Sequence, residues 1–344
     1  MEPIDVKTSI RTIAKLAGTS VTSVSRVLNN SGYTSADVRE KVEAAIKELN
    51  YTPSKGARML RGEPSRMIGL LLPSIDLPFF GILAHSIEQQ LFERGYQTLI
   101  CSTAENREHE ERYISMLLSQ RVDGVIVASA FGDLSHFRSL ASTQIPIVGI
   151  DREMSGISKD AVMADHIEGG RMMAKHLLDL GHRKVAVIGA PGHSQPIQLR
   201  LEGVRQELAA HGLAPAKEAI GEEHRFAEIH EMAQQLLRDC PDVTGLIGTT
   251  DIAAIAAIHA IHHQGHSVPQ DYSVIGFDDL PEASHMLPRL TTIAQPIREV
   301  GLQAVERLEK LIDAHRKEKD LPAMGVLRLP VTLVERESTG PARL

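Results

Sequence analysis

The sequence is poor in cysteine and contains no tryptophan. Its two cysteines, Cys101 and Cys240, lie far apart, and no CxxC pair is present. This excludes a disulfide framework and a thiolate zinc site, and it is typical of a protein in a reducing cytoplasm. The first residues, MEPIDVKTSIRTI, lack the charged-then-apolar pattern of a signal peptide. We therefore expect a cytoplasmic protein.

Long hydrophobic runs and enzyme motifs are also missing. No stretch approaches the roughly 18 consecutive apolar residues of a membrane helix, so we expect no contact with a membrane. The chain contains no GxGxxG, P-loop, GxSxG or HExxH pattern. Because these patterns position the reactive groups of many α/β enzymes, their absence argues against catalysis. We expect no catalytic residue and no cofactor.

The net charge of -7 argues at first against a nucleic-acid partner, but the charges are unevenly distributed. Residues 1–66 hold 11 of the 37 Lys and Arg residues and only 7 of the 44 Asp and Glu residues. A small basic head therefore precedes an acidic body. This distribution indicates that only the head meets phosphate groups.

Three short helices are expected in the head. Apolar residues recur at helical spacing in residues 10–17, after Ser20, and from Ser35 to about residue 50. Gly18 and the polar run 29–32 separate these segments. Two short helices joined by a glycine-containing turn and closed by a third helix form a helix-turn-helix unit.

The second helix of such a unit lies in the DNA major groove and presents its first turns to the base edges. Here those turns carry Val21, Thr22, Ser25 and Arg26. A core position for Val21 is the alternative, but other apolar residues already fill the buried face. Arg26 can donate two hydrogen bonds to guanine, and Thr22 can contact a thymine methyl group. We expect these side chains to contact DNA.

A short connector, residues 53–61, follows the head. It has only about two helical turns and contains Gly56, so we expect it to be helical only when DNA and a partner copy hold it. Met59 and Leu60 are apolar residues in a polar segment, and such residues can wedge between base steps from the minor groove. The alternative is a contact between two paired connector helices, and both roles are compatible.

From residue 67 onward, short apolar runs alternate with amphipathic helical segments. This alternation is typical of doubly wound parallel α/β sheets, and the number of units favours two lobes. We expect the chain to cross between the lobes near residues 162, 293 and 325. The expected domains are a helix-turn-helix over 1–52, a hinge and linker over 53–65, and a two-lobed core over 66–344, with lobe 1 at about 66–162 plus 293–325 and lobe 2 at about 163–292 plus 326–344.

Ligands of open α/β sheets bind beyond the carboxyl ends of the strands. Aromatic, acidic and arginine residues follow the expected strands, a combination that suits a polyhydroxylated ligand such as a sugar. Because Arg200 is among them, a carboxylate or phosphate group on the ligand stays open. The candidate effector-binding residues are Asp76, Phe79, Phe80, Ser129, Asp151, Arg200, Phe226, Asp251, Asp278 and Gln295.

Two competing interpretations are less favoured. His259, His263 and His266 share one helical face, a spacing that can hold zinc or nickel. A polar run at a helix end is the simpler interpretation, so we expect no metal site. A solute-binding protein would need the same core, but the basic head and the absent signal peptide argue against it.

Taken together, these motifs resemble the LacI/GalR repressor family. The matching segments cover nearly the whole chain and are IRTIAKLAGTSVTSVSRVLNN, REKVEAAIKELNYTPS, GARMLRG, HLLDLGHRKVAVIG, RLEGV, GFDD, LTTIAQP and LVERESTG. The resemblance implies a periplasmic-binding-protein-like core with an effector cleft. It also implies a homodimer on a pseudo-palindromic operator in double-stranded DNA.

The resemblance further implies individual roles in the head and the connector. Val21, Thr22 and Arg26 would read bases, and Leu60 would intercalate at the operator centre. The remaining expected DNA contacts, mostly to phosphate groups, are Ser20, Ser25, Asn29, Tyr51 and Ala57.

Two dipeptides depart from the family pattern. Thr250-Asp251 stands where Asn-Asp is common, and Asp165-His166 stands where Asp-Asn is common. The tail lacks the leucine heptad of tetrameric members, which favours a dimer.

The sequence therefore predicts a DNA-binding transcriptional regulator, expected to be a repressor, whose operator affinity is set by a small-molecule effector.

Overall fold

The computed structural model describes residues 9–28, 31–51, 64–189, 191–317 and 324–343. The chain divides into two compact units, and the boundary lies between Ser65 and Arg66. Most of the expected hinge, residues 53–63, lies outside the described residues. In the part of the chain that the structure covers, no helix is both long enough and apolar enough to span a bilayer.

The first unit contains α1 (Ile10–Leu16), α2 (Val21–Leu28) and α3 (Ala36–Glu48). A serine hydroxyl caps the start of each helix by accepting a backbone N–H from the first turn. The turn between α1 and α2 contains Gly18 with φ +59°. The predicted helix-turn-helix is confirmed, and its small core consists of Ile13, Ala14, Ala17, Val24, Val27, Val42 and Ala45.

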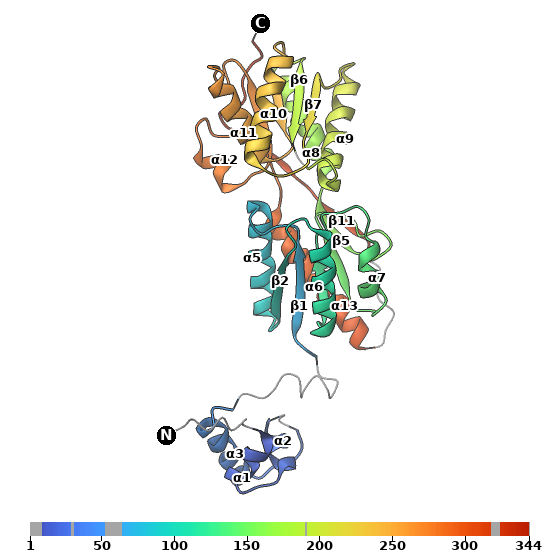
Figure 1. The fold of residues 1–344 in the computed structure, drawn as a ribbon, viewed down its shortest axis with the longest axis vertical. Helices are drawn as coiled ribbons and strands as arrows, with labels where there is room; N and C mark the ends of the chain where they lie inside the picture. The colour runs from blue at the N-terminus through green and yellow to red at the C-terminus, as the bar shows by residue number, and fades with distance from the viewer. Residues whose placement is uncertain (1–8, 29–30, 52–63, 190, 318–323, 344) are drawn as a thin grey trace. The chain divides into compact units, whose positions relative to one another are not determined.

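The second unit contains two lobes, each built on one six-stranded sheet covered by helices on both faces (Figure 1). In lobe 1 the strand order is β11-β5-β4-β3-β1-β2, and all pairs are parallel. The strands are β1 (Met67–Leu72), β2 (Gln97–Ser102), β3 (Gly124–Val127), β4 (Ile147–Ile150), β5 (Ala161–Ala164) and β11 (Val326–Leu329).

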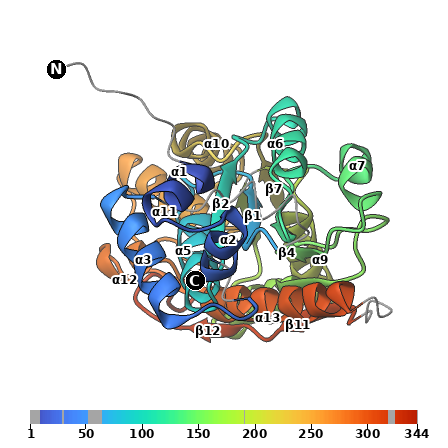
Figure 2. The ribbon, with the colours of Figure 1, turned by 90° about the horizontal axis from the view of Figure 1, so that it is seen from below.

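Two layers of helices enclose the lobe 1 sheet. One apolar core lies under α5 (Pro78–Glu93) and α13 (Ile297–Arg316), the long helix seen along its length in Figure 2. The other core lies under α6 (Arg107–Ser119) and α7 (Arg138–Ala141), with the short 3-10 helix η1 (Ser135–Phe137) leading into α7. Apolar residues therefore face both sides of the strands, as the continuous apolar runs of the sequence predict.

Lobe 2 has the strand order β12-β10-β9-β8-β6-β7, and β12 pairs antiparallel with β10 at the edge. One face is covered by α8 and α9 and the other by α10 and α11. The strands are β6 (Val185–Gly189), β7 (Lys217–Ile220), β8 (Gly245–Gly248), β9 (Ser273–Asp278), β10 (Thr291–Ala294) and β12 (Thr332–Val334). The helices are α8 (His166–Asp179), α9 (Gln195–Ala210), α10 (Phe226–Asp239), α11 (Asp251–His263) and α12 (Pro281–His285).

The chain crosses between the lobes three times. It crosses at Asp165 after β5, at residues 295–296 after β10, and at residues 330–331 between β11 and β12. The third crossing differs from the sequence-based assignment, which places residues 326–344 in lobe 2. Because β11 pairs in parallel with β5, residues 326–329 belong to lobe 1.

Helices α8 and α9 approach each other closely through two glycines. A Cβ atom on Gly170 of α8 would collide with the carbonyl oxygen of Arg200, and one on Gly203 of α9 would collide with that of Ile167. Neither collision can be relieved by a side-chain rotation, because the obstacle is backbone. The close crossing therefore sets the position of the α9 turn that carries Arg200.

We expect Gly170→Ala and Gly203→Ala each to lower the free energy of unfolding by about 1–3 kcal/mol, because overpacking forces the two helix backbones apart. Urea denaturation measures the change. Gly132→Ala is the matched control, since a Cβ there meets nothing within 4 Å. Equal denaturation midpoints for Gly170→Ala and Gly132→Ala would contradict the prediction.

Candidate functional site

The first candidate site is the exposed surface of α2 in the head. Val24 and Val27 are buried in the small core, whereas 46% of Val21 is exposed. Ser20, Thr22 and Arg26 are also exposed, and Ser25 is half-buried. The first turns of α2 therefore present polar side chains and one apolar side chain to solvent, which is the composition that reads base edges in a major groove.

The other expected DNA contacts have different placements. Tyr51 is half-buried and packs against the core of the head. Asn29, Ala57, Met59 and Leu60 lie outside the described residues.

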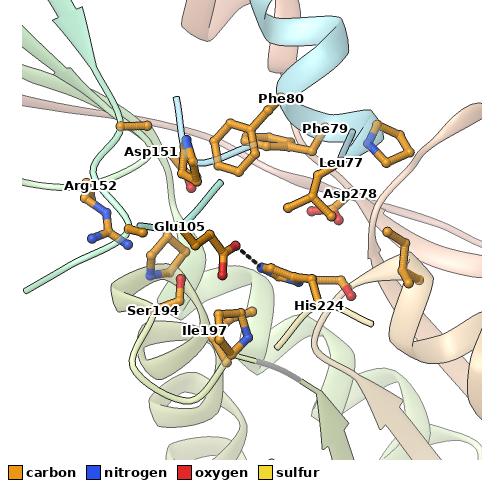
Figure 3. A pocket seen from close by; sticks show the side chains of 18 of the residues that line it. Leu77, Phe79, Phe80, Glu105, Asp151, Arg152, Ser194, Ile197, His224 and Asp278 are labelled. Carbon is orange, nitrogen blue, oxygen red and sulfur yellow. Dashed lines mark ion pairs between the residues drawn. The ribbon is translucent and has the colours of Figure 1, made fainter. Parts of the chain in front are cut away.

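The second candidate site is a cavity between the two lobes of the second unit (Figure 3). Its volume, including the open mouth, is about 690 Å³. The loops that follow β1, β2, β3 and β4 line it from lobe 1, and those that follow β6, β7, β8 and β9 line it from lobe 2. The cavity therefore lies beyond the carboxyl ends of the strands, as expected for a parallel α/β fold.

Six of the ten candidate effector residues line this cavity, and four do not. The lining residues are Phe79, Phe80, Ser129, Asp151, Arg200 and Asp278. Phe79 and Phe80 lie on one side, with ring centroids 5.0 Å apart and an edge-to-face arrangement. They supply an apolar face on which the C–H groups of a ligand can pack.

The other four candidates lie elsewhere. Asp76 is exposed in the loop after β1, and its backbone N–H bonds to Ser74 Oγ. Phe226 starts α10 and packs against His230 and His259. Asp251 and Gln295 are buried behind the cavity wall, where they hold other residues of the site.

Arg200 is the centre of a buried polar network at the base of the cavity. Its guanidinium lies 3.8 Å from the centroid of the Phe277 ring. Nη1 donates to the Thr249 carbonyl at 2.6 Å and lies 3.4 Å from Asp278 Oδ1. Gln295 Nε2 donates to the same carboxylate oxygen at 2.6 Å. The positive charge of Arg200 is therefore already compensated within lobe 2.

His166 extends this network to lobe 1. Arg200 Nε donates to His166 Nδ1 at 3.3 Å, and His166 Nε2 lies 3.3 Å from Asp151 Oδ1. Burial lowers the pKa of His166, so the imidazole is neutral and carries its proton on Nε2, because Nδ1 accepts from Arg200. Asp151 Oδ1 is buried without a well-directed hydrogen bond from any described residue. The His166 Nε2–H group lies beside this oxygen, so the two side chains link lobe 2 to lobe 1.

Two neighbouring carboxyl groups near this network are difficult to ionise. Burial raises the pKa of Asp251 to about 7, and the charge of Asp278 adds to the rise. Burial also raises the pKa of Asp278 to about 6, against the opposing effect of Arg200. Asp251 accepts hydrogen bonds from the Leu280 N–H and the Thr292 hydroxyl. Asp251 therefore positions the loop that carries Asp278.

Four titratable lining residues were absent from the sequence-based set. They are Glu105, Arg152, His193 and His224. All follow strands at their carboxyl ends, so the rule that selected Asp151 also applies to them, but nothing in the sequence shows which loop residues point inward. Glu105 of lobe 1 and His224 of lobe 2 face each other, with Oε1 and Nε2 3.9 Å apart (Figure 3).

The electrostatics of this facing pair favour a neutral imidazole. Burial, together with the charges of Arg200 and His193, lowers the pKa of His224 to about 4. Burial raises the pKa of Glu105. Near neutral pH the cavity therefore contains carboxylates and two arginines but no charge on His224.

The histidines that share a helical face do not form a metal site with other residues. His263 Nδ1 lies 3.0 Å from His230 Nε2, whereas the His266 ring packs against Tyr272. Among the residues that the structure describes, no three His, Cys, Asp or Glu side chains are arranged to hold a metal ion.

Known proteins resemble both units. Residues 9–54 match the model described as bacterial regulatory proteins of the lacI family, and residues 174–339 match the periplasmic binding protein-like domain. The chain is 39% identical to the HTH-type transcriptional regulator DegA of Bacillus subtilis, over 98% of this chain and 99% of that protein. It is 35% identical to the ribose operon repressor of Halalkalibacterium halodurans, over 96% and 97% of the two chains.

A solved structure shares the fold along nearly the whole chain. The lac repressor dimer bound to operator and the anti-inducer ONPF matches with a TM-score of 0.85 and 30% identity. The match covers 97% of this chain and 99% of that one.

The raised pKa of Asp251 predicts how the stability of the fold depends on pH. Because its folded pKa exceeds the ordinary value of 3.8, the folded state holds this proton more tightly, and stability is lost as pH rises towards 7. Asp251→Asn removes this loss. We therefore expect its stability relative to the unsubstituted protein to increase between about pH 5 and about pH 8 in urea denaturation.

Asp239→Asn is the matched control. Hydrogen bonds from Lys217 and Gln235 lower the pKa of Asp239 below 3.8, so its ionisation is complete over this pH range. The relative stability of the control should not change with pH. A pH-independent difference for Asp251→Asn would contradict the prediction.

Proposed function

Because this chain belongs to the LacI family of bacterial regulatory proteins, we propose that it is a transcriptional repressor whose affinity for operator DNA is set by a small molecule bound between the lobes. The observation that carries the proposal is an interlobe cavity in a chain whose head exposes the first turns of α2. The domains of this repressor are a helix-turn-helix over 1–52, a hinge over 53–65 and an effector-binding core over 66–344.

Val21, Thr22 and Arg26 read bases in the major groove in this proposal. Their exposure supports it, since the same helix buries Val24 and Val27. Ser20, Ser25, Asn29, Tyr51, Ala57 and Leu60 complete the expected DNA contacts.

The repressor acts as a homodimer on a pseudo-palindromic operator, in the cytoplasm and at the nucleoid when bound. Two large apolar side chains support self-association. Phe92 at the end of α5 is 72% exposed, and Ile100 on the edge strand β2 is 46% exposed. In this proposal both side chains become buried against the second copy.

The effector is a neutral hydroxylated molecule, with a sugar as the specific candidate. Glu105, Asp151 and Asp278 face the cavity as acceptors for hydroxyl groups, and Phe79 and Phe80 offer an apolar face. An anionic ligand is disfavoured, because these carboxyl groups outnumber the two arginines and Arg200 is already compensated. Similarity to a ribose operon repressor agrees with this class of ligand.

Base reading by α2 predicts separable effects on DNA binding. Operators are first selected from a randomised duplex library with the full chain. Thr22→Ala and Arg26→Ala should each lose about 1–3 kcal/mol of operator affinity and relax the preference at one base position. Lys41→Ala removes an exposed positive charge on α3 and should keep the preference for each base of the operator. Gel shift measures both properties.

A duplex that contains one half-site tests the dimer in the same assay and should bind much more weakly than the full operator. Unchanged sequence preference in both α2 variants would overturn base reading by this helix.

The effector is tested with a panel of neutral sugars, sugar phosphates, uronates and nucleobases. At least one neutral sugar should raise the Tm of the full chain and change its operator affinity by roughly 5- to 150-fold. Asp278→Asn should weaken both responses while the ligand-free variant still binds the operator. A nucleobase that raises the Tm, without any sugar that does so, would refute the sugar assignment.

A further inference from the structure

Glu110 is a fully buried carboxylate that lies on α6, outside the lining of the interlobe cavity. It faces the lobe 1 core, near the apolar Ile114 and Leu117 of the same helix. Burying a carboxylate is unfavourable unless hydrogen bonds compensate for its lost hydration. The partners of Glu110 therefore indicate what this residue holds in place.

Among the described residues, the hydrogen-bond partners of the Glu110 carboxyl group all lie in the segment that follows β3. The Ser129 hydroxyl donates to Glu110 Oε2 at 3.1 Å, and the Ala130 N–H donates to Oε1 at 3.3 Å. The imidazole of His136 lies with Nε2 2.5 Å from Oε2. One carboxylate thus fastens the start and the end of segment 129–136.

His136 is as deeply buried as its partner. Its side chain is 1% exposed, and its Nδ1 has no hydrogen-bond partner among the described residues. The ring instead packs against Phe137 and Phe131, at centroid distances of 4.6 and 6.5 Å. The hydrogen bond to Glu110 is therefore the polar contact that fixes the orientation of this ring.

The fastened segment is a wall of the effector cavity. Ser129 and Ala130 line the cavity directly, but Ser129 is fully buried and its hydroxyl also accepts the Phe131 N–H at 3.1 Å. The hydroxyl of Ser129, a candidate effector contact from the sequence, is thus used within the wall. Its contribution to the cavity is to hold the backbone in place.

Phe131 connects the wall to two other residues that line the cavity. Its carbonyl accepts a hydrogen bond from Arg152 Nη1 at 3.0 Å. Its ring stacks on His193, which belongs to lobe 2, with centroids 6.4 Å apart. A displacement of the wall would therefore move a cationic group of lobe 1 and an imidazole of lobe 2 together.

We propose that Glu110 and His136 are positioning residues of the effector site: they fix segment 129–131, and through it Arg152 and His193, in the arrangement that binds ligand. This inference rests on the proposed function, because it presupposes a ligand in the cavity. Neither residue touches the ligand itself.

Glu110→Gln is the principal test, because the amide keeps the size of the side chain and accepts with one oxygen only. The probe is the neutral sugar that raises the Tm most in the panel above. We expect its dissociation constant to rise roughly tenfold to a hundredfold, the effect of losing a buried hydrogen bond to a charged group. The ligand-free variant should bind operator as tightly as the unsubstituted protein. Glu108→Gln, at an exposed position of α6 whose carboxylate pairs with Arg112, should leave both affinities unchanged.

His136→Gln tests the other end of the pair and replaces Glu110→Gln if that variant does not fold. In the double variant the loss of sugar affinity should not exceed the larger of the two single-variant losses, because both residues act on the same wall segment. A purely structural role predicts a different result, namely a lower Tm and the same fractional loss of affinity for every ligand. The positioning role predicts a changed preference between two sugars that differ at one hydroxyl group.

Hydrogen exchange of the backbone amides in 129–137 tests the wall without any ligand. Exchange should be faster in Glu110→Gln than in Glu108→Gln. If the sugar binds Glu110→Gln and the unsubstituted protein equally well, the inference is overturned while the proposed function stands. If no sugar binds the unsubstituted protein, the proposed function fails, and unchanged exchange in Glu110→Gln then overturns the positioning role as well.

Discussion

The buried charge of Arg200 is the constraint on which the interlobe site depends. The charge of a guanidinium in a closed, largely apolar region must be compensated by polar partners. The fold supplies three of them, the Thr249 carbonyl, the Asp278 carboxylate and the neutral ring of His166. His166 then faces Asp151 of lobe 1. One cation therefore organises acceptors from both lobes, and its own position follows from the close approach of two glycine-bearing helices.

The same constraint explains why the cavity suits an uncharged ligand. Burial raises the pKa of Asp278 in its lining and that of Asp251 behind it, and burial keeps the imidazole of His224 neutral. A hydroxylated molecule can exchange hydrogen bonds with these groups without adding a charge.

Much of this organisation could be predicted from the sequence, because it depends on periodicity. The helical phase of α2 separates exposed Val21 from buried Val24, and strand–helix alternation predicts two doubly wound sheets. Side-chain direction in loops could not be predicted, since it is set by tertiary contacts. For that reason Asp251 and Gln295, which were predicted to contact the effector, lie behind the cavity wall and support it. Glu105 and His224 line the cavity although they were not predicted to do so. The pairing of β11 with β5 was missed because two adjacent apolar runs do not reveal which sheet each one joins.

The three crossings between the lobes are extremely short. One residue separates β5 from α8, and two residues separate both β10 from α13 and β11 from β12. Because element-terminal residues absorb the backbone changes of a domain movement, any relative movement of the two lobes must be taken up at these three crossings. A ligand that contacts both lobes can then favour one arrangement of the lobes only by as much as it binds that arrangement more tightly.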